Sequence, residues 1–331
     1  MPPRRVVLPL LLAVLVFLPF VLNPYLVFVI SSIFIYSILA LGLNLLLGYS
    51  GQFAFANAAF FGIGAYATSL LKIHAGVNFW IGLPLGGLIT AGIGVLVGLP
   101  ALRLSGLYLA MATLAFAQLV QWVLTHWQGF TFGAGGIKVP QPGFGPSPFS
   151  YETNVYFLSL ILASLAVVAT WNLVRSKVGR AFVAIRDGEV AAQALAIDLA
   201  WYKTTAFGLS AFYAGIAGGL HSALLRFIAP EGYDLFQMVT HFSMVVIGGL
   251  GSVTGSILGA ALLTVLPEVL RTVKSVQEIV FGAILMLCII FLPDGLYGFV
   301  RQHAAAWRET LHRAPARRLP AEVAAGADVR P

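Results

Sequence analysis

The feature that most constrains the fold is a series of apolar segments, each about 20 residues long, that recurs along most of the chain. A helix of about 20 apolar residues spans the hydrocarbon core of a bilayer, whereas a barrel strand needs only about ten. Only 9% of the 331 residues are charged, against about 25% in soluble globular proteins. These patterns predict an all-α, polytopic membrane protein.

We expect about ten transmembrane or re-entrant helices. The first apolar segment lacks a small-residue cleavage site, so we expect it to be retained as a span. The segments 239–250 and 253–270 are shorter than about 20 residues, which leaves open whether they cross twice or form a re-entrant hairpin. We expect one membrane domain over 1–300 and a basic, partly disordered tail over 301–331. The expected spans lie near 6–22, 25–47, 51–71, 79–101, 104–126, 155–174, 204–226, 239–250, 253–270 and 276–300.

Basic residues are distributed unevenly between the two sides of the predicted membrane. With the N-terminus inside, fourteen Lys and Arg residues fall on the cytoplasmic side and five fall outside. The positive-inside rule therefore favours both termini in the cytoplasm. This bias explains the net charge of +7 without a role in binding nucleic acid. The loop 127–154, rich in Gly, Pro and aromatic residues, is then external, and the segment 175–203 is cytoplasmic.

The segment 175–203 is a polar stretch, rich in alanine, between two apolar spans. Placing just four of its charged side chains at a bilayer centre would cost roughly 10–14 kcal/mol, so the segment lies outside the hydrocarbon. Its alanines predict a helix, with Leu195 and Leu199 on one face because they are four residues apart. Two interpretations remain open: a loop lying on lipid headgroups, or a helix over 179–203 that docks a soluble partner.

Small and polar residues mark two breaks between apolar segments. Gly48 and Gly51 at the first break align with Gly248 and Gly251 at the second, which hints at an internal duplication. Glycines at such breaks are typical of transporters that build their pathway from discontinuous helices, although tight interhelical turns are the alternative. The candidate pathway residues are Asn44, Gly48, Ser50, Gly51, Gln52, Asn57, Gln118, Gly248 and Gly251.

The chain shows no pattern typical of an enzyme or of an autonomous pump. It has no GxxxxGK[ST], HExxH or GxSxG motif, so we expect no catalytic, metal or cofactor site. The span interiors hold essentially no acidic or basic residue, which argues against proton coupling. His126, His221 and His241 lie at predicted span ends and are expected to be interfacial. A transporter of this kind needs an external source of energy.

Several motifs, taken together, resemble one known family. From about residue 35 to 300, the chain resembles the membrane subunits of branched-chain amino-acid ABC importers, the LivH/LivM family, and among these the LivM type. The motifs are LGLNLLLGYSGQFAFANAAFFGIGAYATSLL at 41–71, LRLSGLYLA at 102–110, GRAFVAIRDGEVAAQALAIDLAWYK at 179–203 and MVVIGGLGSVTGSILGAALLTVLPEVLR at 244–271.

The resemblance implies a permease subunit of an ATP-driven importer in the bacterial plasma membrane. The solutes implied are leucine, isoleucine and valine, with urea and short amides as variations within the family. The partners implied are a homologous LivH-type permease, an extracytoplasmic substrate-binding protein, and two ABC ATPase subunits that bind the ATP and Mg. Membrane lipid surrounds the chain.

The resemblance also implies a coupling segment at Glu189–Asp198 that fits a groove on an ATPase subunit. The usual pattern of the family has Gly where Ala196 stands and often Asn where Asp198 stands; we expect these changes to leave the helix intact. A Thr-Gly-Gly run of the family is replaced here by residues 132–136. The residues expected to couple to the ATPase are Gly179, Arg180, Arg186, Asp187, Glu189, Ala192, Leu195, Ala196 and Asp198.

Two readings from other classes stay open beside the ABC permease. A self-sufficient secondary amino-acid carrier or channel would transport solute without ATP. A membrane enzyme acting on lipid would need convergent acid/base or metal-binding residues near an interface, and the sequence shows none.

Overall fold

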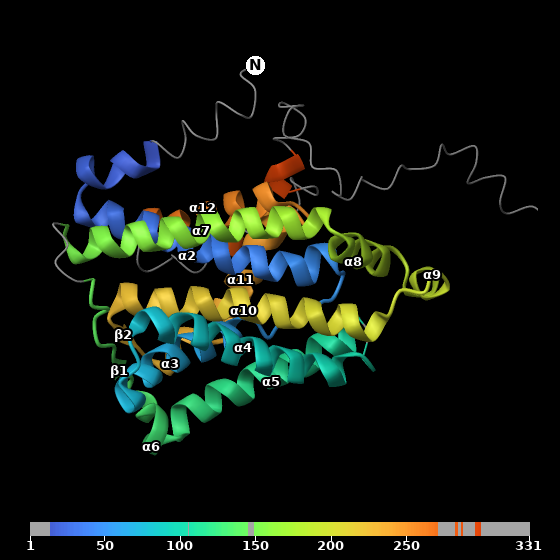
Figure 1. Cartoon of the computed structure of the whole chain (residues 1–331), viewed down its shortest axis with the longest axis horizontal. Coiled ribbons are helices and arrows are strands. Elements are labelled where there is room, and N and C mark those ends of the chain that lie inside the picture. The colour runs from blue at the N-terminus through green and yellow to red at the C-terminus, as the bar shows by residue number, and fades with distance from the viewer. Residues whose placement is uncertain are drawn as a thin grey trace, which may run out of the picture.

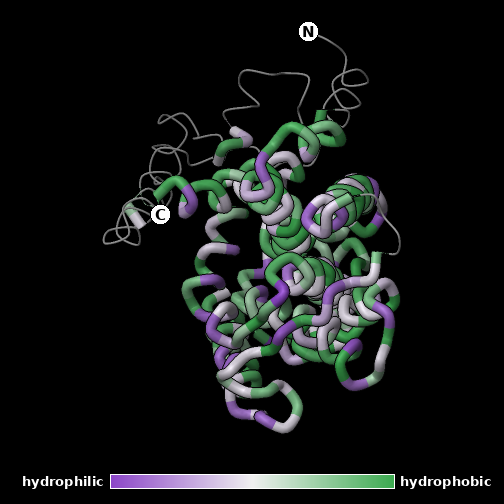
Figure 2. Tube along the Cα trace, turned by 90° about the vertical axis from the view of Figure 1, so that its left-hand side faces the viewer, coloured by the Kyte–Doolittle hydropathy of each residue, from purple (hydrophilic) through white to green (hydrophobic). Residues whose placement is uncertain are grey.

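Long helices lie side by side in the computed structural model, which describes residues 14–104, 106–144, 149–270, 282–283, 286 and 295–298 (Figure 1). Within these residues, six helices are long and apolar enough to cross a membrane, and hydrophobic positions dominate along them (Figure 2). Of the predicted span 6–22, residues 14–22 are described and 14–21 are helical. The predicted span 276–300 lies largely outside the described residues, and the tail 301–331 lies wholly outside them.

The helices follow the predicted apolar segments closely. The span predicted at 79–101 has the bounds of α4, and that at 253–270 has the bounds of α12. The long helices are α2 (Pro24–Asn44), which continues as a π-helical turn (Leu45–Tyr49), α3 (Asn57–Ala75), α4 (Phe79–Ala101), α5 (Leu107–His126), α7 (Tyr151–Arg175), α10 (Leu199–Leu225) and α12 (Val253–Leu270), with a shorter α11 (Leu235–Gly248).

Helix α10 lies at the centre and packs against α2, α3 and α4. Small residues allow the close approach. Gly64 of α3 lies against the backbone of Gly215, and Gly218 lies against the backbone of Phe61, so neither glycine leaves room for a Cβ. Membrane helices associate through such small residues because lipid removes the hydrophobic driving force between them.

One end of the bundle, called here the β1–β2 end, carries a small ladder that the sequence did not predict. Strand β1 (Ile137–Lys138) pairs antiparallel with β2 (Phe227–Ile228). The short helices α6 (Gln128–Thr131), η2 (Gly133–Gly135) and η3 (Pro230–Tyr233) lie beside it. The ladder ties the loop 127–154 to the segment that follows α10.

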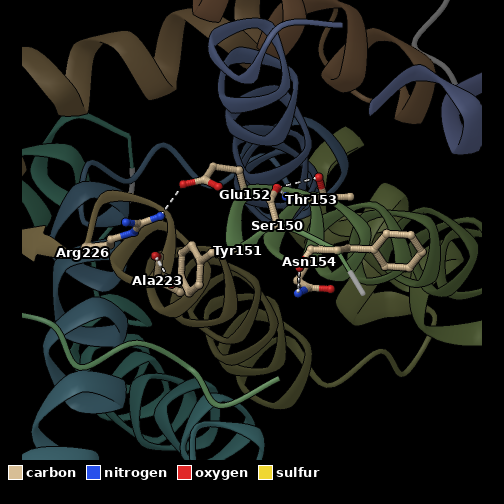
Figure 3. A network of polar contacts seen from close by, with 8 residues as sticks. Ser150, Tyr151, Glu152, Thr153, Asn154, Ala223 and Arg226 are labelled. Atoms are coloured by element: carbon tan, nitrogen blue, oxygen red, sulfur yellow. Dashed lines mark hydrogen bonds and ion pairs between the residues drawn. The ribbon is translucent and has the colours of Figure 1, made fainter. Parts of the chain in front are cut away.

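A polar network holds the start of α7 to the end of α10 at this same end (Figure 3). Ser150 caps α7 by accepting the amide N–H of Thr153. The Tyr151 hydroxyl donates to the carbonyl of Ala223 at 2.7 Å. The Arg226 guanidinium lies 2.5 Å from Glu152 Oε1 and 4.1 Å from the centre of the Tyr151 ring.

Helices α11 and α12 form a hairpin. Helix α11 begins next to η3 at the β1–β2 end, and the turn 249–252 reaches the opposite end, beside Gly48. Helix α12 then returns, since Glu268 near its end accepts a hydrogen bond from Tyr25 near the start of α2. The start of α11 and the end of α12 therefore both lie at the β1–β2 end of the bundle, and the turn between them lies at the opposite end.

The segment 175–203 is two short helices, so the prediction of one continuous helix over 179–203 is wrong. Helix α8 (Lys177–Asp187) is followed by Gly188 at its C-cap. Helix α9 (Glu189–Ala194) is followed by Leu195 at its C-cap and then by Ala196, which has a left-handed φ of 58°. Asp198 then caps α10 by accepting the amide N–H of Trp201 at 3.1 Å. Helix α9 projects beyond the ends of the long helices, at what is called here the α8 end (Figure 1).

Candidate functional site

The site lies where the last turn of α8 meets the carboxyl end of α2. The Arg186 side chain is only 10% exposed, and its Nη1 donates to the carbonyl of Gly48 at 2.9 Å. Gly48 lies in the π-helical turn, where the chain is about to leave the helix, so its carbonyl belongs to those that a helix end leaves without an intrahelical partner. A cation is also favoured at a helix C-terminus by the helix dipole. Arg186 therefore caps α2 from a different helix.

The second glycine break packs against the first. Asn44 is buried, and its Oδ1 accepts the amide N–H of Gly251 at 2.9 Å. Its Nδ2 donates to the carbonyl of Ser252 at 2.8 Å and to Ser256 Oγ at 2.7 Å. A Cβ on Gly48 would collide with Gly251 N, and one on Gly251 would lie 3.3 Å from Arg186 Nη1. The guanidinium thus touches both breaks; we call this the Arg186 junction.

A second connection links α9 to the same region. Lys203 is buried on α10, and its Nζ lies 2.7 Å from Oε1 of the half-exposed Glu189. The Lys203 carbonyl accepts a weak hydrogen bond of 3.4 Å from Gln52 Nε2, which also donates to Ser50 Oγ at 2.7 Å. Both short helices are therefore connected to residues 48–52.

The predicted coupling residues divide into an inward and an outward set. Arg186, Ala192 and Gly179 are buried or nearly so, and a Cβ on Gly179 would strike the backbone of Val174. Leu195 is 74% exposed, and Val190, which the sequence analysis did not single out, is 82% exposed. The residues whose side chains face outward are Arg180, Asp187, Glu189, Leu195, Ala196 and Asp198.

Two expectations about this segment are wrong. Leu195 and Leu199 do not share a helical face, because Leu195 is the C-cap residue of α9 and Leu199 is the first residue of α10. Ala196 does not continue a helix. Its N–H group donates to the carbonyl of Gln193, and the N–H group of Ile197 donates to the carbonyl of Ala192. These two bonds form a Schellman motif, whose left-handed position favours Gly.

Most of the predicted pathway residues meet at the Arg186 junction. Asn44, Gly48, Gly51 and Gly251 contact one another or Arg186. Gly248 serves close packing, since a Cβ there would meet the backbone of Gly255. Gln118 is exposed on α5 and Asn57 is buried at the start of α3. The two glycine breaks that align in the sequence therefore also contact one another in space.

His221 and His241 belong to a buried aromatic cluster, so the interfacial interpretation is wrong for this pair. Gln237 Nε2 lies 3.0 Å from the Tyr36 hydroxyl, to which it donates, and 3.2 Å from His241 Nε2. Phe61 lies between the histidines, with ring centroids 5.0 and 5.3 Å away. Only the folded packing of α2, α3, α10 and α11 brings these rings together. Among the described residues, no three His, Cys, Asp or Glu side chains lie together as a metal-binding group.

Comparison with known proteins gives matches along most of the chain. The family described as "Branched-chain amino acid transport system / permease component" matches residues 25–292. The high-affinity branched-chain amino acid transport system permease protein LivM of Salmonella typhimurium is 34% identical over 322 residues, 90% of this chain and 76% of the relative.

More distant relatives extend this pattern. The permease protein LivH of Escherichia coli is 24% identical over 291 residues, 80% of this chain and 91% of the relative. The autoinducer 2 import system permease protein LsrC of an Enterobacter species is 25% identical over 214 residues, 60% of each chain. No solved structure matches. The family match and the identity to LivM together show that this multi-pass membrane protein belongs to the family of branched-chain amino acid transport system permeases.

Proposed function

We propose that this chain is one permease subunit of an ATP-driven importer that carries branched-chain amino acids into the cell across the bacterial plasma membrane. The observation that carries the proposal is the Arg186 junction. It connects a projecting polar segment to two breaks in the apolar bundle through a nearly buried guanidinium. A force applied to α8 and α9 would act directly on these breaks.

The ATPase subunits would bind at α9. This helix presents Val190 and Leu195, two large apolar side chains that are more than 70% exposed, among charged and small residues. Exposed apolar side chains rimmed by polar ones are typical of protein-binding surfaces. ATP and Mg would bind to those partners. The chain itself would supply the segment on which the ATPase subunits act and the pathway through which the solute passes. The α8 end would then be cytoplasmic. Both termini would be cytoplasmic as well, in line with the distribution of basic residues.

The remaining partners follow from the family. A homologous LivH-type permease would form the second half of the pathway, and an extracytoplasmic binding protein would deliver solute at the β1–β2 end. Leucine, isoleucine and valine are the expected solutes. Because most of the buried polar residues in the described spans are neutral, urea and short amides fit the same chemistry and form the alternative solute class.

The docking role is tested by placing charge on the apolar tip of α9. Val190→Asp and Leu195→Asp should release the ATPase subunits during purification and abolish ATP-dependent leucine uptake in proteoliposomes, while the chain stays in the membrane. Val190→Leu keeps the apolar surface and should retain the ATPases. Full retention by both aspartate variants would contradict the docking role and favour a segment that lies on lipid headgroups.

The same proteoliposomes separate this proposal from a self-sufficient carrier. The complete complex should take up leucine only when ATP and the ATPase subunits are present. Uptake of leucine by this chain alone, without ATP, would instead establish a secondary carrier.

A further inference from the structure

The start of helix α3 lies inside the protein, which is unusual for a helix end. Asn57 is 4% exposed, and Ala56, Ala58 and Ala59 are exposed by 2% or less. The first N–H groups of a helix have no acceptor within the helix and are ordinarily satisfied by water or by a capping side chain. Ala56 at the cap position has no side-chain acceptor to offer.

The donors of this first turn have no acceptor within the described residues. The first backbone bond of α3 runs from Phe60 N to the carbonyl of Ala56 at 3.0 Å. Neither a backbone nor a side-chain acceptor in the described part of the chain receives the N–H groups of Asn57, Ala58 and Ala59. Buried backbone donors are nearly always paired. This helix end can therefore receive a hydrogen-bond acceptor that the described part of the chain does not provide.

Asn57 supplies a second and independent observation. Its Nδ2 and Oδ1 atoms are both buried, and neither has a partner in the described structure. Cα–Cβ bonds in a helix tilt toward its N-terminus, so a side chain in the first turn leans toward the free N–H groups. The site thus combines three backbone donors, one amide donor and one amide acceptor.

From this arrangement we propose that the amino-terminal end of α3, with Asn57, binds the carboxylate and ammonium groups of an α-amino acid during transport; this rests on the proposed function. The backbone donors and the positive end of the helix dipole favour a carboxylate. Asn57 Nδ2 would add a donor to the carboxylate, and Oδ1 would accept from the ammonium. No acidic or basic residue occurs in 51–60, so a zwitterion without net charge fits better than an ion.

A short non-helical segment, residues 51–56, leads into this end of α3. In residues 51–56, the Phe53 side chain is about half exposed, and the Phe55 N–H donates to Thr113 Oγ1 at 2.8 Å. The Phe55 ring lies 5.1 Å from that of Phe242 on α11. At its start, Gly51 lies directly against Arg186. This segment is therefore packed against the Arg186 junction, so under the proposal a movement of α8 would shift it and the start of α3 together.

The proposal is tested by Asn57→Leu in the complete importer, with Thr68→Val as the matched control. Thr68 also lies on α3 and has a buried hydroxyl without a partner in the described structure, but it lies three turns from the proposed site. Both substitutions remove buried polar atoms and keep the side-chain volume approximately, so neither should lower the unfolding temperature. Asn57→Leu should slow leucine uptake by roughly 10-fold to 100-fold, the loss expected for a hydrogen bond to a charged group, whereas Thr68→Val should leave uptake unchanged.

Labelling of the unaltered complex provides a second measurement, which does not depend on a variant folding. A diazirine analogue of leucine, photoactivated during ATP-driven transport, should label the peptide that contains 53–60, and excess leucine should suppress that labelling. Unchanged uptake by Asn57→Leu, or labelling of the permease only elsewhere, would overturn the proposal. If the unaltered importer took up no amino acid at all, the proposed function would be what had failed.

Discussion

At the scale of single residues, Ala196 has a backbone conformation that alanine rarely adopts. Ala196 has a φ of 58° and closes α9 through a Schellman motif. A residue with a Cβ is disfavoured in this region by roughly 1–2 kcal/mol, which accounts for Gly in the usual pattern of the family. The preceding alanines predict helix continuation, and only the capping bonds of α9 reveal the turn.

We therefore expect Ala196→Gly to stabilise the end of α9. The expected gain is about 1 kcal/mol, less than the full strain because Gly is more flexible in the unfolded chain. Amide hydrogen exchange at positions 196 and 197 should slow by about fivefold, the factor that corresponds to this energy. Ala194→Gly, two residues earlier at the last helical position of α9, should instead accelerate exchange. Equal effects of the two substitutions would mean that position 196 is not strained.

Gly48 gives a second residue-scale prediction, from packing. A Cβ here would meet Asn44 Oδ1 and Gly251 N, both of which are held by their own hydrogen bond. Gly48→Ala should destabilise the bundle by about 1–3 kcal/mol, as overpacking does in well-packed cores. Gly92→Ala on α4, where a Cβ would meet no atom within 4 Å, should be neutral or stabilising. Thermal unfolding in detergent compares the two.

At the scale of elements, apolar length predicts the helices well and polar contacts decide where they break. The bounds of α4 and α12 follow from hydropathy alone. The segment 51–56 continues the apolar pattern into the predicted span 51–71, yet it is not helical. Its backbone is held instead by Thr113 Oγ1 at Phe55 and by Arg186 at Gly51. Such long-range contacts leave no periodic signal, which is why the start of α3 could not be predicted.

The Glu189–Lys203 pair is the element-scale contact between α9 and α10. Glu189→Gln should cost about 1–3 kcal/mol, because it leaves the ammonium of a buried Lys203 without its charged partner. Lys203→Met removes that ammonium itself. The double variant should therefore be more stable than the sum of the two single effects predicts. A double-mutant cycle on unfolding temperatures measures this coupling. Strict additivity would show that the pair does not hold α9 against α10.

At the scale of the whole molecule, two glycine breaks and one projecting segment meet at the α8 end of the bundle. The sequence indicated each of the three parts, but not that Arg186 joins them. From the sequence, Arg186 was expected to contact the ATPase. In the structure its guanidinium points inward to Gly48 and Gly251 instead. The exposed side chains lie on α9 instead. Under the proposed function, ATPase binding and the transmission of its movement would therefore depend on different residues of one segment.

The most direct test of this account replaces Arg186 by Met in the reconstituted importer and measures leucine uptake and ATP hydrolysis together. Lys177→Met, which removes an exposed cation from the same helix, is the control. The account predicts that Arg186→Met keeps the ATPase subunits bound and hydrolysing ATP while uptake per ATP falls roughly 10-fold, the size expected for losing a charged hydrogen bond. An unchanged ratio of leucine to ATP would contradict the claim that Arg186 transmits the movement.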